Sequence, residues 1–211
     1  MPNQPEPDVE NSFLSRARYP KGKKRLQAIL DATYDIVISE GLTAASQEAI
    51  AKRADVTQSA VRHYFPTKDE LLIAFFSTGI ERLHQLLQNK IAETDRDPRA
   101  QLLESASLHY DRMLEVEDVY FFEAAAFWGR NPEFRGVRDE WYQSLESHYV
   151  RLIKRINPDW DKQRCIEASY QVLTLILGGW VTMGSSRLFY KRRSRASLKS
   201  MLLRGIERLI E

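Results

Sequence analysis

Residues 46–72, SQEAIAKRADVTQSAVRHYFPTKDELL, predict two short helices joined by a tight turn. Ser46 and Thr57 are suitable N-cap residues, because a hydroxyl oxygen there accepts a hydrogen bond from an unpaired first-turn N–H. The turn falls at residues 54–56. Pro66 ends the second helix, since a proline disfavours helical geometry in the residue before it. The expected helices, 46–54 and 57–65, form a helix-turn-helix outline.

This outline suits nucleic-acid recognition, because a short second helix fits the ~12 Å wide major groove of DNA. Six apolar residues are spaced to pack inside a three-helix unit: Ile50, Ala51, Ala54, Val56, Val61 and Phe65. That packing leaves Gln58, Ser59, Arg62 and His63 outside with hydrogen-bonding ends, while Tyr64 and Lys68 flank them within reach of phosphates. Many helical proteins contain short helix–turn–helix segments, so the outline alone is only moderately specific.

The stretch before this motif predicts an arm followed by a helix. Residues 1–20 are polar and proline-rich, which is typical of a disordered segment. The basic residues of the arm and of the helix start either contact DNA, along the phosphates or in the minor groove, or form a solvated charged surface. They are Arg16, Arg18, Lys21, Lys23, Lys24 and Arg25. From Lys23 onward the apolar residues fall on one helical face, and they are Leu26, Ile29, Leu30, Thr33, Ile36 and Val37. Gly41 then suits a helix C-cap.

The rest of the chain also predicts helices. Glycine and proline together number 17, about 8% of the residues against a typical ~12%. No window shows the alternation expected of strands. The helical runs separated by the prolines cover about 68–90, 99–115, 118–129, 136–156, 160–189 and 196–210. Residues 168–186 carry no charge, but their polar residues and Gly178-Gly179 favour a buried helix of a soluble protein, covered in part by a dimer partner.

The formal net charge of +2 hides a strong segregation. Residues 11–68 carry ten basic and five acidic side chains, residues 69–190 carry fourteen and nineteen, and residues 191–211 carry seven and two. A polyanion responds to the local basic surface, so the total does not exclude DNA. We expect the basic run at 190–195 to be a solvated loop. The single cysteine, Cys165, and the lack of a signal peptide predict a reducing, cytoplasmic setting.

Enzyme chemistry finds little support. Glu81 and His84 have the Glu-x-x-His spacing of di-iron helical bundles, but His109 and His148 have no glutamate three residues before them. The chain has no His-Glu-x-x-His motif and no phosphate-binding glycine loop. We therefore predict a protein that is not an enzyme and holds no metal or other cofactor.

Residues 23–72 closely resemble the N-terminal domain of the TetR family of bacterial transcriptional regulators. The similarity runs through residues 29–32 (ILDA), 40–41 (EG), 50–56 (IAKRADV) and 61–72 (VRHYFPTKDELL). The last block, an aromatic pair followed by a loop and a lysine, is the most specific. The resemblance implies an all-α chain in three parts, which are a disordered basic arm (1–20), a helix-turn-helix DNA-binding domain (21–68) and a larger helical ligand-binding and dimerisation domain (69–211).

The resemblance also implies roles for individual residues. The residues expected to face bases are Gln58, Ser59, Ala60, Arg62 and His63. Those expected to contact the DNA backbone are Ser46, Thr57, Tyr64 and Lys68, and Gln47 or Glu48 is placed near the groove. Two positions depart from the family pattern. Asp55 stands where glycine is usual, although aspartate tolerates left-handed geometry. Arg62 stands where tyrosine is usual, and it either reads guanine or contacts a phosphate.

The larger domain is expected to hold a small-molecule effector and a dimer seam. The candidate pocket residues, which are more often plain core when taken singly, are His109, Met113, Phe127, Trp128, Trp141 and Tyr142. The candidate seam residues are Leu173, Ile176, Leu177, Trp180, Leu198, Leu202 and Ile206.

We therefore predict a homodimeric, ligand-responsive repressor that binds a palindromic double-stranded DNA operator in the bacterial cytoplasm and associates with the nucleoid when bound. Activation and ligand-free repression remain open. A helical protein-interaction module is the alternative, and it would lack salt-dependent DNA affinity.

Overall fold

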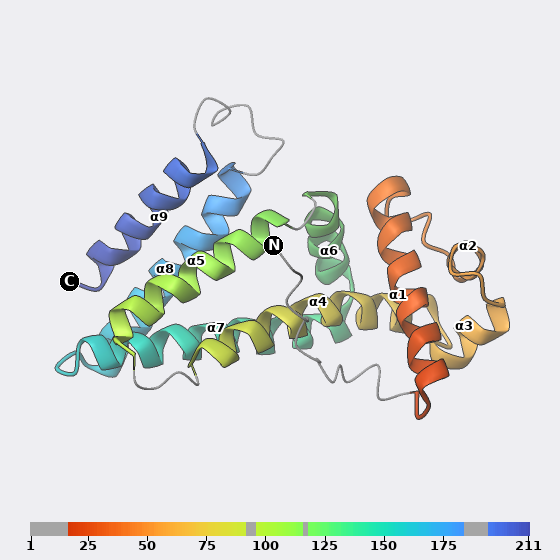
Figure 1. Cartoon of the computed structure of the whole chain (residues 1–211), viewed down its shortest axis with the longest axis horizontal. Coiled ribbons are helices and arrows are strands. Elements are labelled where there is room, and N and C mark those ends of the chain that lie inside the picture. The colour runs from red at the N-terminus through yellow and green to blue at the C-terminus, as the bar shows by residue number, and fades with distance from the viewer. Residues whose placement is uncertain (1–16, 92–95, 116–117, 184–193) are drawn as a thin grey trace. The chain divides into compact units, whose positions relative to one another are not determined.

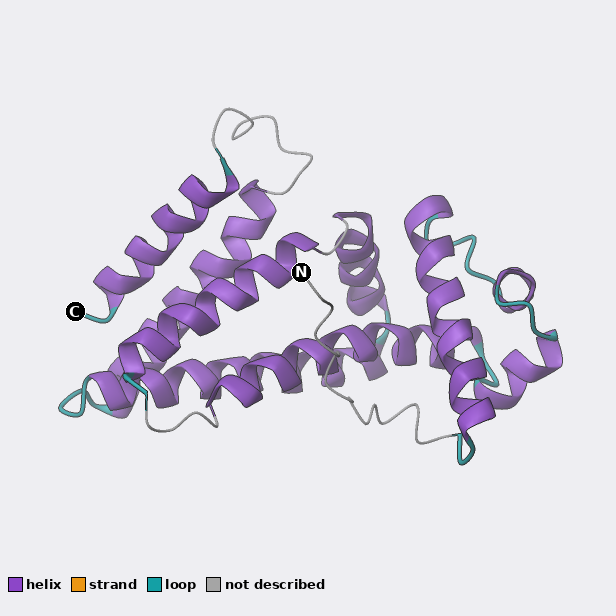
Figure 2. Ribbon diagram, in the orientation of Figure 1, coloured by secondary structure: helices purple, strands orange, loops and turns teal. Residues whose placement is uncertain are grey.

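A computed structural model describes residues 17–91, 96–115, 118–183 and 194–211, and all regular structure in those ranges is helical (Figures 1 and 2). The all-α prediction is confirmed. The helices are α1 (Pro20–Glu40), α2 (Gln47–Arg53), α3 (Gln58–Tyr64), α4 (Lys68–Ile91), α5 (Pro98–Glu115), α6 (Asp118–Arg130), α7 (Pro132–Ile156), α8 (Lys162–Met183) and α9 (Arg195–Leu209). The arm through residue 16 and the basic residues 190–193 lie outside the described ranges.

Helix α1 begins three residues before the predicted start. Pro20 occupies its first turn, where the missing proline N–H would have no helical partner in any case. The six residues of the predicted apolar face are all buried. Gly41 ends the helix with φ +84°, and its N–H donates to the Val37 carbonyl at 3.1 Å. Glycine adopts this backbone geometry without the steric penalty of a side chain.

Both predicted caps of the helix-turn-helix are present. The hydroxyl oxygens of Ser46 and Thr57 each accept a hydrogen bond at 3.1 Å from the N–H three residues later. Between the helices, Asp55 takes φ +52°, the left-handed geometry that its side chain tolerates. The Val56 N–H returns to the Ala51 carbonyl at 3.0 Å, which closes the turn.

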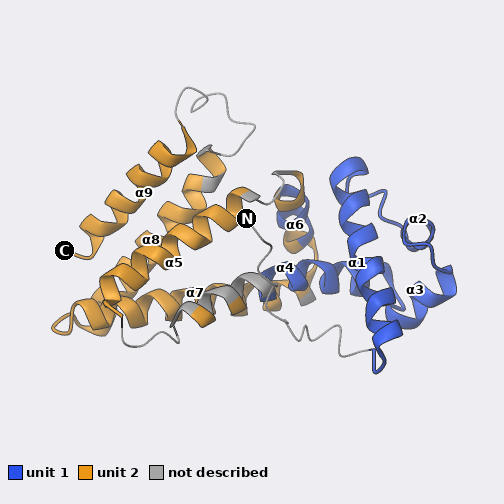
Figure 3. Cartoon of the chain, in the orientation of Figure 1, with its two compact units in different colours: residues 1–82, 122–127 blue, residues 83–121, 128–211 orange. Residues whose placement is uncertain are grey.

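The chain divides into two compact units (Figure 3). Unit 1 comprises residues 1–82 and 122–127, so it includes α1–α3, most of α4 and a short piece of α6. Within this unit, Phe76 packs on Phe127 with ring centroids 5.4 Å apart. The Glu123 carboxylate accepts from the Leu42 N–H at 3.2 Å. The α6 segment is therefore joined to the loop after α1. The predicted functional boundary at residue 68 stays a prediction.

Unit 2 comprises residues 83–121 and 128–211, and α5, α7, α8 and α9 pack on one another within it. Buried aromatic and aliphatic side chains of α5 and α7 fill its core, including Tyr110, Phe134 and Tyr149. Helix α8 matches the predicted uncharged run as far as Met183, and the rest of that run lies outside the described residues. No helix in the described part of the chain is long and apolar enough to span a bilayer.

Candidate nucleic-acid interface and buried polar cluster

Helix α3 turns a polar face to solvent. Val61 and Phe65 are fully buried and anchor the helix in unit 1. Gln58, Ser59, Arg62 and His63 are exposed, and Ala60 is half-buried. The apolar spacing of the sequence therefore predicted both sides of this short helix correctly.

A contact that the sequence did not reveal holds the end of α3. The Gln47 side-chain amide donates to the Phe65 carbonyl at 2.7 Å, across eighteen residues. Gln47 was expected near the DNA groove, but its amide satisfies a helix-terminal carbonyl instead. Glu48, the other residue expected there, is exposed. The Gln47 contact depends on the packing of α2 against α3, so local spacing gives no signal for it.

The four residues expected at the DNA backbone all lie at helix ends. Ser46 and Thr57 are exposed at the starts of α2 and α3. Tyr64 is half-buried, and a Cβ atom at Gly22 would lie 3.2 Å from its hydroxyl oxygen, so Gly22 leaves room for that hydroxyl. The Lys68 ammonium donates to the Leu42 carbonyl at 3.1 Å and to that of Thr43 at 3.3 Å.

Arg62 is not engaged in an ion pair with the other described residues of this surface. Arg53 of α2 pairs with Glu40 at 3.0 Å. Among the residues the structure describes, Arg62 has no carboxylate partner. An unpaired guanidinium on an exposed helix is suited to a bidentate contact with a base edge or a phosphate. Residues 11–68 contain more basic than acidic side chains, and the resulting positive potential favours such a contact with DNA.

The predicted pocket residues divide between the two units. Phe127 belongs to unit 1, where it packs on Phe76. His109, Met113, Trp128 and Trp141 are buried in unit 2. Tyr142 is only half-buried, and partial burial raises the pKa of its hydroxyl. The sequence did not reveal this division, because both faces of α6 are apolar.

Unit 2 contains buried polar atoms without hydrogen-bond partners in the described residues. They are Ser105 Oγ and His109 Nε2 of α5, Trp128 Nε1 of α6 and Trp141 Nε1 of α7. Each such atom costs about 1–3 kcal/mol, and native proteins contain few of them. Met113 lies one turn after His109 on the same face of α5. With Met113 added to the four residues above, four of the five are also predicted pocket residues. The sequence analysis missed only Ser105.

His109 is the most constrained group of this cluster. It is fully buried, and its Nδ1 lies 3.4 Å from the Tyr149 hydroxyl of α7. The two rings stack with centroids 6.5 Å apart. Burial, followed by the effect of nearby His148, lowers the pKa of His109 to about 3. The imidazole is therefore neutral at physiological pH and can donate or accept one hydrogen bond at Nε2.

Most predicted seam residues belong to the protomer's own core. Leu173, Ile176, Leu198, Leu202 and Ile206 are buried, and Leu177 is half-buried. The Trp180 side chain lies outside the described part of the structure. Over residues 170–182 the exposed face of α8 instead consists of seven residues without charge, namely Tyr170, Gln171, Thr174, Leu175, Gly178, Val181 and Thr182. Exposed Met201 adds an apolar side chain on α9.

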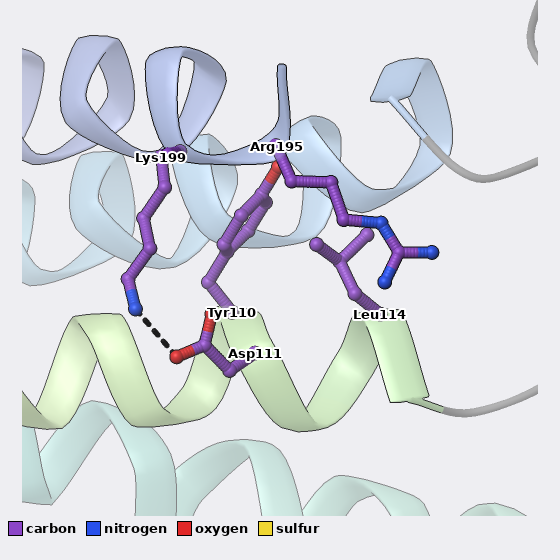
Figure 4. A pocket seen from close by; sticks show the side chains of 6 residues that line it. Tyr110, Asp111, Leu114, Arg195 and Lys199 are labelled. Carbon is purple, nitrogen blue, oxygen red and sulfur yellow. Dashed lines mark hydrogen bonds and ion pairs between the residues drawn. The ribbon is translucent and has the colours of Figure 1, made fainter.

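A shallow cavity of about 340 Å³ lies between α5 and α9 (Figure 4). Tyr110, Asp111 and Leu114 line it from α5, and Arg195, Ala196 and Lys199 line it from α9. An ion pair of 2.5 Å joins Lys199 to Asp111 across it. In the described residues no group of histidine, cysteine and acidic side chains could hold a metal ion. The His84 side chain lies outside those residues, so the di-iron alternative is not tested.

Comparison with known proteins places this geometry in a family. Residues 29–75 match the family model for bacterial regulatory proteins of the tetR family. The transcriptional regulator PksA of Bacillus subtilis is 32% identical over 108 residues, about half of each chain. The regulator BetI of Yersinia pestis is 27% identical over 173 residues, which cover 80% of this chain and 85% of BetI.

Solved structures share the fold at low identity. A putative transcriptional regulator from Pseudomonas aeruginosa PAO1 has a TM-score of 0.70 at 16% identity, over 93% of this chain and 92% of its own. FadR from Bacillus subtilis, solved in complex with stearoyl-CoA, has a TM-score of 0.62 at 16% identity, over 88% and 97%. The matched motif, the regulators that share it and the common fold lead to one conclusion: residues 29–75 form a helix-turn-helix domain of the tetR type, in a chain that is similar to transcriptional regulators and has their fold.

Proposed function

We propose that the protein binds a palindromic DNA operator as a homodimer, represses transcription there and is released by a small-molecule effector. The observation that carries the DNA-binding part is the polar face of α3, where Gln58, Ser59, Arg62 and His63 are exposed above a buried anchor. A helix of this kind inserts its outer face into the major groove. In this proposal these four residues and Ala60 contact bases.

The proposed contacts with the DNA backbone use hydrogen-bond donors at the helix ends near α3. The hydroxyls of Ser46 and Thr57 use an oxygen lone pair for capping, so their protons remain to donate to phosphates. Lys68 has three ammonium N–H groups and uses two of them on backbone carbonyls. Its third N–H and the Tyr64 hydroxyl complete the proposed set. Such contacts fix the register of the protein on DNA and carry no sequence information.

A homodimer accounts for the exposed face of α8. Its seven exposed residues over 170–182 carry no charge, and Tyr170 remains 66% exposed. An uncharged face of this length on a regulator suits a self-complementary interface with two-fold symmetry. The five buried residues of the predicted seam then lie beneath this interface as core. Two α3 helices related by that symmetry would read two half-sites.

The effector proposal rests on the buried polar cluster of unit 2. An effector shifts a regulator only if it binds one conformation more tightly than the other. Repression relieved by the effector is the proposed direction, and activation is the alternative. The regulator is proposed to act in the cytoplasm, where its DNA is present.

Selection of bound sequences from random double-stranded DNA tests the proposal with the purified full chain. We expect a palindrome with half-sites about one helical turn apart. Affinity for the selected site should fall steeply as salt rises, because bound phosphates release counterions. Recovery of no palindrome would overturn the operator proposal. Salt-independent binding to protein partners without DNA affinity would instead favour an interaction module.

A further inference from the structure

We propose that the effector is an uncharged, largely apolar small molecule with a carbonyl or similar hydrogen-bond acceptor, bound between α5 and α7 beside Trp141 and His109. This inference rests on the proposed role of the protein as an effector-responsive regulator. It adds the chemical class of the ligand and the groups that recognise it.

These groups lie along the interface between α5 and α7. The His109 ring stacks on Tyr149, and the Arg155 guanidinium donates to the Gln101 side-chain oxygen at 2.8 Å. These two contacts show that α5 and α7 run antiparallel. Trp141 is eight residues before Tyr149, so it lies about 12 Å further along α7 at 1.5 Å per residue. Trp141 and Tyr149 therefore set the length of the proposed site.

Deformable side chains lie between the two ends. Met113 follows His109 by one turn of α5, and it is buried. Leu145 is the corresponding buried residue of α7, one turn after Trp141. Methionine is unbranched and flexible, so it can move aside for a ligand at small energetic cost. Two fused aromatic rings that carry a short substituent approach this length.

The unpartnered polar atoms indicate what the ligand must offer. Trp141 Nε1 is a hydrogen-bond donor only, so its missing partner is an acceptor. Ser105 Oγ and His109 Nε2 can each donate as well. A ligand carbonyl would satisfy the Trp141 indole N–H. A second acceptor, at the other end of the ligand, would satisfy the His109 imidazole.

The electrostatics of the core favour a neutral ligand. Among the described residues of unit 2, the buried polar side chains are Gln101, Ser105, His109, His148 and Ser169, and none is a lysine, arginine, aspartate or glutamate. An anion placed there would lose its hydration without gaining a cationic partner. The lowered pKa of His109 agrees, since its surroundings disfavour charge.

Three matched probes test the inference on the full chain. 2-Acetylnaphthalene is neutral with an acceptor, 2-naphthoate is anionic, and 2-ethylnaphthalene has no acceptor. The chain has four tryptophans, and the ¹H–¹⁵N signals of their indole N–H groups report directly on the proposed donor. We expect 2-acetylnaphthalene to shift the Trp141 signal saturably and to bind at least fivefold more tightly than either other probe.

Two tryptophan variants make the test specific. Trp141→Phe keeps an aromatic ring but removes the donor, so it should weaken 2-acetylnaphthalene binding about fivefold and leave 2-ethylnaphthalene within twofold. Trp160→Phe is the matched control, because Trp160 lies after α7 beneath the Arg164 guanidinium, 3.7 Å from its ring centroid. The Trp141 indole ¹H–¹⁵N signal of the unsubstituted chain is a second measurement in case Trp141→Phe does not fold, and it should shift with the ketone but not with 2-ethylnaphthalene.

Three results would overturn the inference: 2-naphthoate binding as tightly as the ketone, equal effects of the Trp141 and Trp160 variants, or no shift of the Trp141 signal with any probe. DNA selection on the same preparation separates this inference from the proposed function. A protein that selects a palindrome but binds no probe contradicts only the ligand class. A protein that binds the ketone but selects no DNA contradicts only the proposed function.

Discussion

Three of the four histidines in this chain precede a tyrosine, at His63-Tyr64, His109-Tyr110 and His148-Tyr149. The His63 and Tyr64 rings of α3 lie 5.2 Å apart at 70°, and those of His148 and Tyr149 of α7 lie 5.0 Å apart at 86°. The local geometry is nearly the same, yet His63 is exposed whereas His109 and His148 are buried. The dipeptide therefore does not determine the environment; the helix face on which it lies does.

This difference separates two kinds of recognition. Helix α3 keeps its hydrogen-bonding side chains in water, where an external polymer can reach them. Helices α5 and α7 enclose theirs, so any partner of these groups must lie inside unit 2. In the proposed function, the same residue types contact DNA in one unit and an effector in the other.

The largest expected effect comes from introducing glutamate at buried His109 and, for comparison, at exposed His63. His109→Glu puts a carboxylate where no cation is buried, and it should lower the free energy of unfolding by about 3–5 kcal/mol. His63→Glu on the exposed face should change it by less than about 0.5 kcal/mol. Urea unfolding measures both. Equal losses of stability would show that the two environments do not differ.

The DNA affinity of the same two variants should show the reverse order. His63→Glu places a negative charge at the proposed DNA surface, so it should weaken binding at least tenfold in a fluorescence anisotropy assay. His109→Glu should affect DNA binding only through the fraction of folded protein.

A second prediction concerns the exposed face of α8 over residues 170–182, which carries no charged side chain. Apart from the adjacent residues and the backbone of the same helix, no heavy atom lies within 4 Å of a Cβ placed at Gly178 or at Gly136 of α7. Gly178→Arg should raise the dissociation constant of the dimer about 100-fold, because it introduces charge into the proposed interface. Gly136→Arg should leave it unchanged. Sedimentation velocity distinguishes the outcomes, and a dimeric Gly178→Arg protein would exclude this face.

The pH dependence of stability sharpens the contrast between the histidines. The pKa of His109 is about 3 in the folded protein, against an ordinary value near 6.5 in the unfolded chain. Between these values the unfolded state binds a proton that the folded state does not. Stability is therefore complete above about pH 6.5 and falls as the pH drops toward 3, by about 2 kcal/mol between pH 7 and pH 5.

Two conservative variants isolate this contribution from those of other groups. His109→Gln should reduce the slope of unfolding free energy against pH between 5 and 7, whereas His63→Gln should not alter it. Identical slopes for His109→Gln and the parent protein would contradict the assigned burial.

The sequence predicted α3 well because its signals are local. Thr57, Pro66 and the spacing of Val61 and Phe65 each act within a few residues, and the structure places the cap, the helix end and the buried anchors accordingly. Gln47 was misplaced because its partner, the Phe65 carbonyl, is eighteen residues away and is reached only after α2 and α3 pack.

The pocket and seam were harder to predict for the same reason. Apolar periodicity identifies a buried face but not what covers it. Leu173 and Ile176 are covered by the protomer itself, while Tyr170 and Val181 of the same helix remain exposed. Phe127 and Trp128 are adjacent in sequence yet belong to different units. Distinguishing these cases requires the tertiary arrangement.

A smaller effect should separate base recognition from phosphate contact on α3. Arg62→Ala should weaken binding about tenfold at sites that carry the preferred base and much less at sites altered at that position. Arg53→Ala on α2 is the control, since Arg53 pairs with Glu40. Binding to a panel of operator variants measures the difference. A uniform loss across the panel with a shallower salt dependence would show that Arg62 contacts only a phosphate.

The smallest effect is expected at the ion pair between α5 and α9. Lys199 and Asp111 are 2.5 Å apart, but their side chains are 28% and 43% exposed, so water screens their attraction. A double-mutant cycle with Lys199→Ala and Asp111→Asn should give a coupling free energy of about 0.5 kcal/mol or less. A coupling above about 2 kcal/mol would mean that this pair behaves as a buried one. In that case charge would contribute to the interior packing of unit 2, and the argument for a neutral ligand from its uncharged core would weaken.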